Sequence, residues 1–155
     1  MRAALTLDDH TSAGSGDEAE MHESFCASHL PWNLRFDPTV APTSTRVNLG
    51  QPWVVGCSVG SMSGYRRAAE LRRTPGEYIA VLMIRRGTET LTQRGRSAEV
   101  TAGTALGDGV RPVECFSAGT LIKDTLFVPQ HLLTDAVPDL DSALARTSRS
   151  SHSPA

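Results

Sequence analysis

The sequence predicts one all-β domain, in which short strands form a sandwich or barrel between an N-terminal helix and a short C-terminal helix. Two observations lead to this prediction. After Pro31, apolar segments alternate with Pro, Gly, Asn or Ser at intervals of roughly ten residues, which is typical of all-β folds. One helix cannot cover so many strands, so they must bury one another. The 155 residues are enough for one hydrophobic core.

The N-terminal part contains the first helix. We expect residues 1–16 to form a disordered leader, because they are mostly small and polar. Ser15 and Glu18 then have the spacing of a capping box, and acidic residues stand where a helix dipole favours them. Apolar residues recur at helical spacing until Pro31, which ends the helix. This helix should lie against the outside of the main body.

The strands are predicted from short apolar or alternating segments. Glycines at Gly87, Gly95 and Gly103 mark corners between them. Residues 78–84 are apolar throughout, as in a strand that is buried on both faces. The predicted strands cover residues 34–36, 46–49, 53–59, 65–71, 78–84, 88–93, 97–101, 113–116 and 121–128.

The C-terminal part begins at Pro129, which is well placed as the first residue of a helix. Pro138 ends this segment, and Asp139 or Asp141 could start one more helical turn. We therefore assign residues 17–138 to the domain. Residues 139–155 are expected to form a mostly disordered tail.

Composition and charge exclude several function classes. The net charge of −2 gives no basic field for nucleic acid, so we expect no direct nucleic-acid contact. The arginine pairs at 66–67, 72–73 and 85–86 are expected on strands, where neighbours point to opposite faces. Three cysteines at wide spacing indicate core residues in a reducing cytosol. Without a signal peptide or an apolar run of about 18 residues, we expect a cytoplasmic protein with no membrane contact.

Catalytic and metal-binding motifs are not found in the sequence. The histidines fall outside the predicted strands, so they cannot assemble a metal-binding set there. Gly56, Ser58 and Gly60 have the G-x-S-x-G spacing, but they fall in a predicted strand rather than in a strand-to-helix elbow, and the strand cysteines have no histidine base. No carboxylate pair stands out. We therefore predict no enzyme activity, no catalytic residue, no metal and no cofactor. The residues considered are His10, His22, His29, His131, His152, Cys57, Cys115, Glu77, Glu89, Glu99, Glu114 and Asp108.

Several turns in residues 76–133 occur in a characteristic order. The apolar segment 78–84 leads to Gly87, and a Gly-Arg turn follows at residues 95–96. Ala-Gly at 102–103 stands in place of Pro-Gly, residues 107–112 end in Arg-Pro, and Phe-Val-Pro at 127–129 precedes a leucine pair. In this order and spacing the segment resembles the N-terminal, cupin-like sensor domain of AraC-type transcription regulators. The resemblance extends more loosely over residues 20–138.

The resemblance implies a cupin-like double-stranded β-barrel, or jelly roll, that binds a small molecule inside and dimerises. Family members continue into two helix-turn-helix units, whereas eighteen residues follow Val137 here. We therefore expect a truncated sensor domain without DNA contact of its own. Its expected partners are a small-molecule effector and either a second copy or a full-length AraC-type regulator.

The ligand pocket is expected to use inward-facing strand residues. The candidates are Trp53, Tyr78, Leu82 and Phe116, since an apolar barrel interior needs such groups. Plain core packing is the alternative explanation for each of them. Two other functions are considered: a cupin-like enzyme, which stoichiometric metal would reveal, and a non-catalytic interaction module, which would bind no small molecule.

Overall fold

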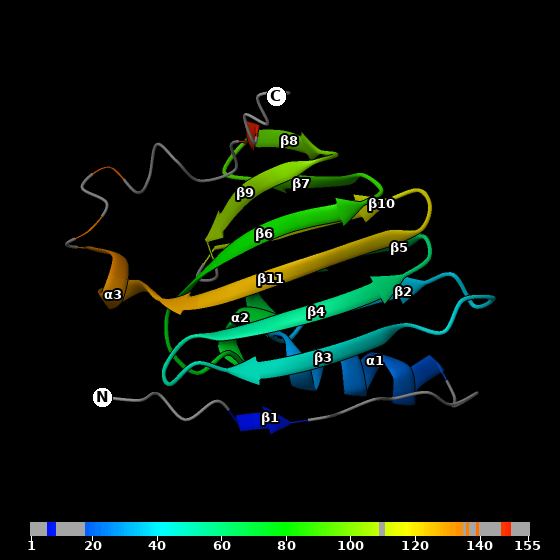
Figure 1. Cartoon of the computed structure of the whole chain (residues 1–155), viewed down its shortest axis with the longest axis horizontal. Coiled ribbons are helices and arrows are strands. Elements are labelled where there is room, and N and C mark those ends of the chain that lie inside the picture. The colour runs from blue at the N-terminus through cyan, green and yellow to red at the C-terminus, as the bar shows by residue number, and fades with distance from the viewer. Residues whose placement is uncertain are drawn as a thin grey trace, which may run out of the picture.

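The computed structural model of the chain consists mainly of β-strands (Figure 1). It describes residues 6–8, 18–108, 111–134, 136, 139 and 147–149. Among these residues, no helix is long and apolar enough to cross a membrane. All strand pairs described are antiparallel, which confirms the predicted all-β class.

The strands form two sheets, which we call sheet A and sheet B. Sheet A contains, from edge to edge, β1 (Thr6–Asp8), β3 (Thr43–Asn48), β4 (Trp53–Val59), β11 (Leu121–Pro129), β6 (Tyr78–Arg86), β9 (Gly103–Asp108) and β12 (Thr147–Arg149). Sheet B contains β2 (Asn33–Phe36), β5 (Met62–Arg66), β10 (Val113–Ser117), β7 (Glu89–Gln93) and β8 (Arg96–Val100). Consecutive strands often lie in different sheets, so the chain crosses repeatedly between the layers.

Side-chain alternation along the strands fills the space between the sheets. In β11 every second residue from Leu121 to Phe127 is buried, and β4 has the same alternation. In β10, Val113 and Cys115 are buried, whereas Phe116 is 55% exposed. Because successive side chains of a strand point to opposite faces, this pattern gives each sheet one inner face. The main core cluster contains Phe25, Leu34, Phe36, Cys57, Val59, Met62, Leu82, Ile84, Leu91, Val100, Ala105, Val113, Cys115 and Leu121.

Glycine corners connect the central strands as predicted. Arg94 and Gly95 both have positive φ, 57° and 70°, and join β7 to β8 in a two-residue hairpin. Two successive positive φ values are the geometry that matches the twist of antiparallel strands. Gly87, with φ 88°, lies between β6 and β7, where a Cβ would collide with the backbone of Thr120.

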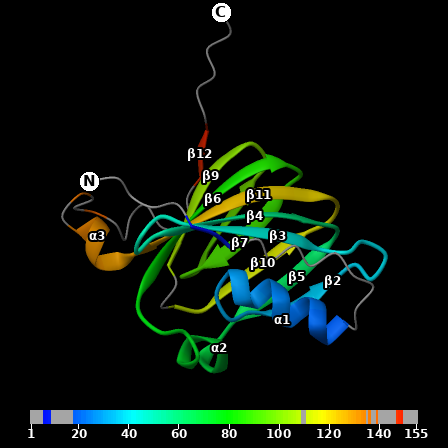
Figure 2. The same cartoon turned by 60° about the horizontal axis from the view of Figure 1, so that its bottom comes forward.

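Three short helices flank the sheets: α1 (Glu18–Ser28), α2 (Ala68–Arg72) and α3 (Gln130–Thr134). In Figure 2, α1 lies beside β2, whereas α3 lies at the opposite end of the molecule. The last residue of α1 is tied to sheet A, since Ser28 Oγ donates to Ser44 Oγ at 3.1 Å and Trp53 Nε1 donates to the Ser28 carbonyl at 3.1 Å. The predicted N-terminal helix and the predicted helix at Pro129 are therefore present as α1 and α3. The capping residue Ser15 and the turn at Asp141 lie outside the described residues.

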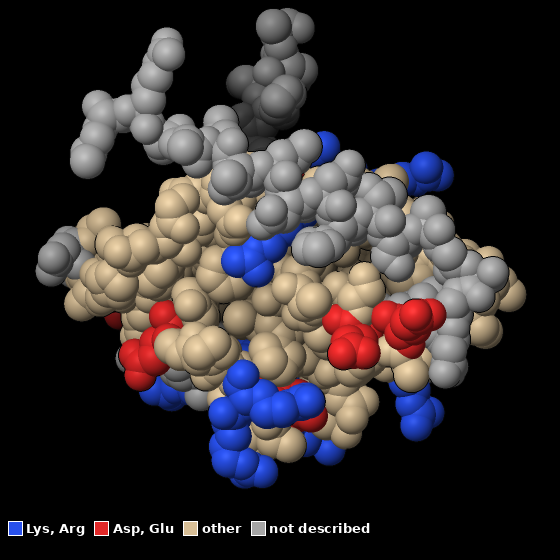
Figure 3. All heavy atoms as spheres, turned by 90° about the horizontal axis from the view of Figure 1, so that it is seen from below, with Lys and Arg blue, Asp and Glu red and all other residues tan. Residues whose placement is uncertain are grey.

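The prediction of one strand over residues 65–71 is wrong. The strand β5 ends at Arg66, and residues 68–72 form α2. Ala, Glu, Leu and Arg are strong helix formers, and Glu70 accepts a hydrogen bond from the Arg67 backbone at 2.9 Å. Arg72 and Arg73 are consequently both exposed, as are Arg85 and Arg86, unlike the expected alternation. Figure 3 shows basic side chains in small groups among acidic and uncharged ones on the face it draws.

Three strands lie where none was predicted. β9 has small residues of weak β-propensity, and its backbone is held by pairing with β6. β1 and β12 fall in the stretches expected to be disordered, 1–16 and 139–155, and they pair with β3 and β9. Edge pairing uses backbone groups, so a low content of apolar side chains does not prevent it. The remainder of these two stretches lies largely outside the described residues.

Candidate functional site

A small cavity of about 50 Å³ lies between the two sheets. Both sheets contribute to its wall, and the segment from α1 into β2 completes it. Most of the wall is apolar, but several polar side chains also reach it. The residues around it are Phe25, His29, Leu30, Trp32, Leu34, Met62, Arg66, Ala80, Leu82, Glu89, Leu91, Gly107, Val113, Cys115, Lys123, Thr125 and Phe127.

Lys123 and Glu89 form an ion pair inside the barrel. The Nζ atom of Lys123, on β11, lies 2.8 and 2.9 Å from the two carboxylate oxygens of Glu89, on β7. The side chains are only 8% and 1% exposed, so the pair joins sheet A to sheet B through the core. Burial is the largest single effect and by itself would lower the pKa of Lys123. The charge and the hydrogen bonds of Glu89, with smaller effects from Cys57 and Cys115, together raise this pKa above its ordinary value. Lys123 is therefore a charged ammonium in the folded protein.

The two strand cysteines lie near this pair as neutral thiols. Burial raises the pKa of Cys57 to about 11 and that of Cys115 to about 12. Both are free cysteines, as is Cys26 on α1. Thiols with such high pKa values are poor nucleophiles, so these two residues act as small core side chains.

His29, just after α1, is a buried neutral imidazole. Burial, reinforced by the charge of Lys123, lowers its pKa to about 3. Its ring stacks on Phe25, with centroids 4.0 Å apart, and its Nδ1 lies 3.0 Å from the Phe25 carbonyl oxygen. A carbonyl can only accept, so Nδ1 carries the proton and Nε2 is left as an acceptor. This Nε2 is buried and has no hydrogen-bond partner among the residues that the structure describes.

A second buried polar atom, also without a partner in the described part of the chain, lies in the same cavity wall. It is Oγ1 of Thr125, which stands two residues after Lys123 on the inner face of β11. Buried polar groups are almost always hydrogen-bonded, because an unsatisfied group costs about 1–3 kcal/mol. Two such atoms around one cavity are the groups that a bound molecule would satisfy.

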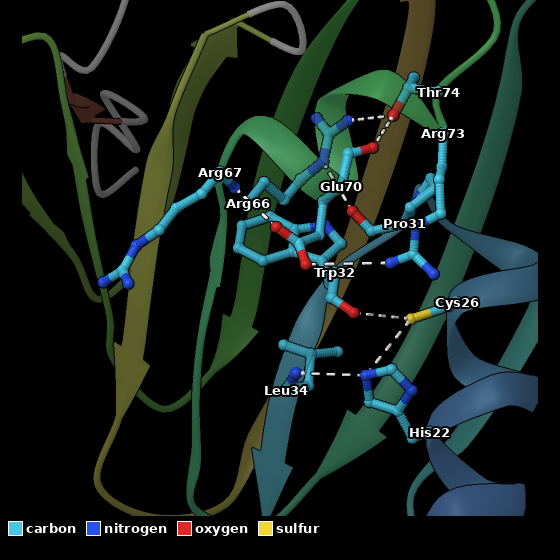
Figure 4. Close-up of polar contacts among 10 residues, drawn as sticks. All are labelled: His22, Cys26, Pro31, Trp32, Leu34, Arg66, Arg67, Glu70, Arg73 and Thr74. Carbon is cyan, nitrogen blue, oxygen red and sulfur yellow. Dashed lines mark hydrogen bonds and ion pairs between the residues drawn. The ribbon is translucent and has the colours of Figure 1, made fainter.

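Arg66 closes the cavity on the side of α2. It is 1% exposed, and its Nε donates to the Pro31 carbonyl at 2.8 Å, while a terminal guanidinium nitrogen donates to Thr74 Oγ1. Figure 4 shows that the side chain joins the turn after α1 to the end of α2. Arg66 thereby fixes the wall segment that leads into β2.

The same close-up shows how α1 is attached to β2. The backbone N–H of Leu34 donates to Nε2 of His22 at 3.3 Å, and Sγ of Cys26 lies 3.5 Å from the Trp32 carbonyl (Figure 4). Burial raises the pKa of Cys26, so it is a thiol that donates a weak hydrogen bond here. These contacts are structural, since they satisfy backbone groups at the junction of the two elements.

The structure brings only one of the four predicted pocket residues to the cavity. Leu82 lines it, whereas Trp53 and Tyr78 pack edge to face next to it, with centroids 4.9 Å apart. Trp53 also stacks on Phe127, which does line the cavity. Phe116 is on the outer face of sheet B, so its prediction as an inward residue is wrong. The neighbouring Cys115 occupies the inner position, and the side-chain period of two turns Phe116 outward.

Sequence reasoning considered His29 but missed the ion pair and the hydroxyl of Thr125 in the cavity wall. Glu89 is among the carboxylates for which the sequence indicates no pair, and Lys123 is not among the candidate residues. Their positions along the strands were a usable indicator, because every second residue of a strand points to the same face. Glu89 is two residues from the buried Leu91, and Lys123 is two and four residues from the buried Leu121 and Phe127. The partner of each lies on another sheet, and a single sequence does not specify such long-range pairs.

No group of three or more His, Cys, Asp or Glu side chains suited to hold a metal ion occurs among the described residues. We assign no catalytic residue on this geometry.

Comparison with solved structures identifies the fold. The chain superposes on the AraC-like transcriptional activator CuxR with a TM-score of 0.73 and 18% sequence identity, over 93% of this chain and 53% of that one. The chain has a cupin-like fold. It spans about half the length of the activator it matches.

More distant similar structures are cupin domains. One is the cupin domain of Schizosaccharomyces pombe Cnp3, with a TM-score of 0.45 and 9% identity over 67% of this chain and 73% of that one. Another is a cupin-2 domain from Rhodospirillum rubrum, with a TM-score of 0.40 and 15% identity over 74% and 90% of the two chains. Neither protein-family models nor the curated proteins gave a match to this chain.

Proposed function

We propose that this cupin-like domain is the sensor and dimerisation domain of an AraC-type transcription regulator, and that it binds a small molecule in the cavity between its sheets. The observation that carries the proposal is the pair of unpartnered buried atoms, His29 Nε2 and Thr125 Oγ1, around one cavity. A site that binds small molecules combines an apolar wall with a few converging polar groups. The similarity to an AraC-like activator supports a regulatory role.

The polar atoms define the chemistry of the ligand. Because His29 Nε2 is an acceptor, the ligand must present an O–H or N–H donor to it. The hydroxyl of Thr125 can accept from the ligand or donate to it. Lys123 and Glu89 neutralise each other, so they do not by themselves require a charged ligand. Leu82 and Phe127 offer apolar surface beside these atoms. We therefore propose a compact ligand with a hydroxyl or amide donor and an apolar part.

The size of the cavity sets a further condition. A volume of about 50 Å³ holds only a few water-sized groups, so a larger ligand needs the wall to move. The segment around Leu30 and Trp32 is the wall element outside the two sheets, and Arg66 holds it through the Pro31 carbonyl. Ligand binding would thus be coupled to the position of α1.

A ligand screen tests the sensor function. Purified protein is heated with a panel of alcohols, sugars, amides and amino acids, and the melting temperature is recorded. A ligand stabilises the folded state by mass action, so a binder raises Tm. The variant Thr125→Val keeps the side-chain shape but removes the hydroxyl. We expect it to fold with undiminished stability and to lose most of the ligand-induced shift.

The matched control is Thr45→Val, an exposed threonine on β3 in sheet A. It should respond to the ligand like wild type. A panel without any binder would favour an interaction module over a sensor. A ligand shift that is equal in both variants would place the ligand elsewhere.

The remaining parts of the proposed function concern partners and chemistry. We propose that the domain forms dimers, either with itself or with a full-length AraC-type regulator, makes no DNA or membrane contact of its own and works in the cytoplasm. Residues 17–138 form its domain in this proposal.

We also propose that it is not an enzyme. Elemental analysis of the purified protein should find iron, manganese and zinc far below one equivalent, and a stoichiometric metal would favour a cupin-like enzyme instead.

A further inference from the structure

The outer face of sheet B carries a row of side chains with an unusual order of charges. The strand registers place five residues side by side, one from each strand: Arg35, Ser63, Phe116, Thr90 and Glu99. Phe116 is at the centre of the row and 55% exposed, more than any other large apolar side chain among the described residues. Arg35 and Glu99 are exposed at the two ends. The row therefore runs from a cation through an aromatic ring to an anion.

This order is complementary to itself. Neighbouring strands are about 4.8 Å apart, so Arg35 and Glu99 lie roughly 10 Å on either side of Phe116. We propose that this face is an interface with a second copy of the chain, related by a two-fold axis that runs parallel to the strands through Phe116. Such a rotation sets Arg35 of one copy opposite Glu99 of the other, and symmetry repeats the pair on the other side.

The charges also select the direction of the axis. A two-fold axis in the same plane but perpendicular to the strands would set Arg35 against Arg35 and Glu99 against Glu99, which is unfavourable. Facing sheets pack with their strands within about 30° of each other, so the rows stay near enough for long side chains to meet. Only the strand-parallel axis joins opposite charges at both ends.

The shape of the face fits an aromatic side chain from the second copy. A hollow of about 460 Å³ lies beside Phe116, and Asn33, Tyr65 and Thr92 contribute to its wall. The partner's Phe116 can insert there, as buried aromatic anchors do at interfaces. Glu114 also lies close to the proposed axis. Its charge is balanced within its own chain by Arg67, 3.3 Å away.

This inference deepens the dimerisation part of the proposed function and rests on it, whereas ligand binding is tested separately. The experiment is sedimentation velocity of the full chain over a concentration series. Arg35→Glu places like charges at both ends of the interface, and so does Glu99→Arg. Each variant alone should raise the dimer dissociation constant by more than about tenfold.

Mixing the two variants gives the decisive measurement. One copy then carries two acidic ends and the other two basic ends, so both pairs are attractive again. We expect a one-to-one mixture of Arg35→Glu and Glu99→Arg to dimerise nearly as well as wild type, an effect that loss of folding cannot produce. The matched control is Arg86→Glu, which makes the same charge change at an exposed residue of β6 in sheet A and should leave the dimer intact.

The possible results distinguish a failure of the proposed dimerisation from a failure of the proposed interface on sheet B. A monomeric wild type would overturn both the dimerisation and this interface. A wild-type dimer that neither charge change weakens would overturn the interface alone. Two monomeric variants that stay monomeric on mixing would overturn the proposed pairing of Arg35 with Glu99.

Discussion

One ion pair inside the barrel and another on the outer face of sheet B differ mainly in burial. Lys123 and Glu89 join the two sheets across the core, with side chains 8% and 1% exposed. Arg67 and Glu114 lie on the outer face, 3.3 Å apart, with side chains 60% and 62% exposed. The chemistry is the same, but water solvates only the second pair.

This difference shows how context sets the role of a charge. Two opposite charges gain little at the surface, because water already solvates them and salt screens them. Inside the barrel, each ion loses its hydration and depends on the other, so neither can be removed without cost. The inner pair therefore fixes how the sheets sit over each other, whereas the outer pair can exchange partners.

Removal of the inner lysine is the strongest test of the comparison. Lys123→Met leaves the carboxylate of Glu89 buried without a counter-ion, which should lower the free energy of unfolding by about 3–5 kcal/mol. Urea denaturation at neutral pH measures this loss.

The double variant Lys123→Met with Glu89→Leu is the control for that experiment. It removes both charges, and most of the stability should return, because an apolar pair can replace a buried ion pair. If the single and the double variant are equally unstable, shape rather than charge is the cause.

The pH dependence of stability is the next largest expected effect, and it extends the comparison to His29. Its pKa is about 3 in the folded protein and 6.5 as the ordinary value, so the unfolded chain binds the proton more readily. The stability that the neutral His29 contributes to the folded state is fully present above pH 6.5 and is lost as the pH falls toward 3. Between pH 7.5 and pH 5 the free energy of unfolding should drop by about 2 kcal/mol.

Denaturation curves of wild type and His29→Phe at the two pH values check this effect. The variant lacks the titrating group, so its stability should change less over the same interval. An equal drop in both proteins would assign the pH dependence to other groups.

The smallest effect is expected at the outer pair. Glu114→Gln should change the free energy of unfolding by less than about 1 kcal/mol, and raising the salt concentration should reduce the difference further. Thermal unfolding at low and high salt measures both. A loss as large as that of Lys123→Met would show that burial does not decide the strength of these pairs.

Much of the fold could be predicted from local sequence patterns. The glycines at 87, 95 and 103 and the apolar segment 78–84 gave the central strands, because turn geometry and alternation act over a few residues. The segment after Arg67 was mistaken for a strand, although its Ala, Glu, Leu and Arg residues favour a helix. β9 escaped prediction because its small residues show little preference of their own.

The cavity could be predicted only in outline. Leu82 was correctly expected to face the interior, but Phe116 was not, since the register of β10 depends on its neighbours β5 and β7. Glu89 and Lys123 are far apart in the chain and meet only because the sheets stack. A pattern of alternating residues shows which side chains share a face, not which faces meet.

The sequence by itself determined an all-β body with glycine corners, a helix before it and a short helix after it, because propensity, turn geometry and side-chain period are local properties of the chain. Only the tertiary structure decided that an ion pair, a neutral imidazole and a lone hydroxyl share one cavity, and that Phe116 faces outward between opposite charges. These arrangements arise when distant strands are brought side by side, and their energies depend on the burial that this packing creates.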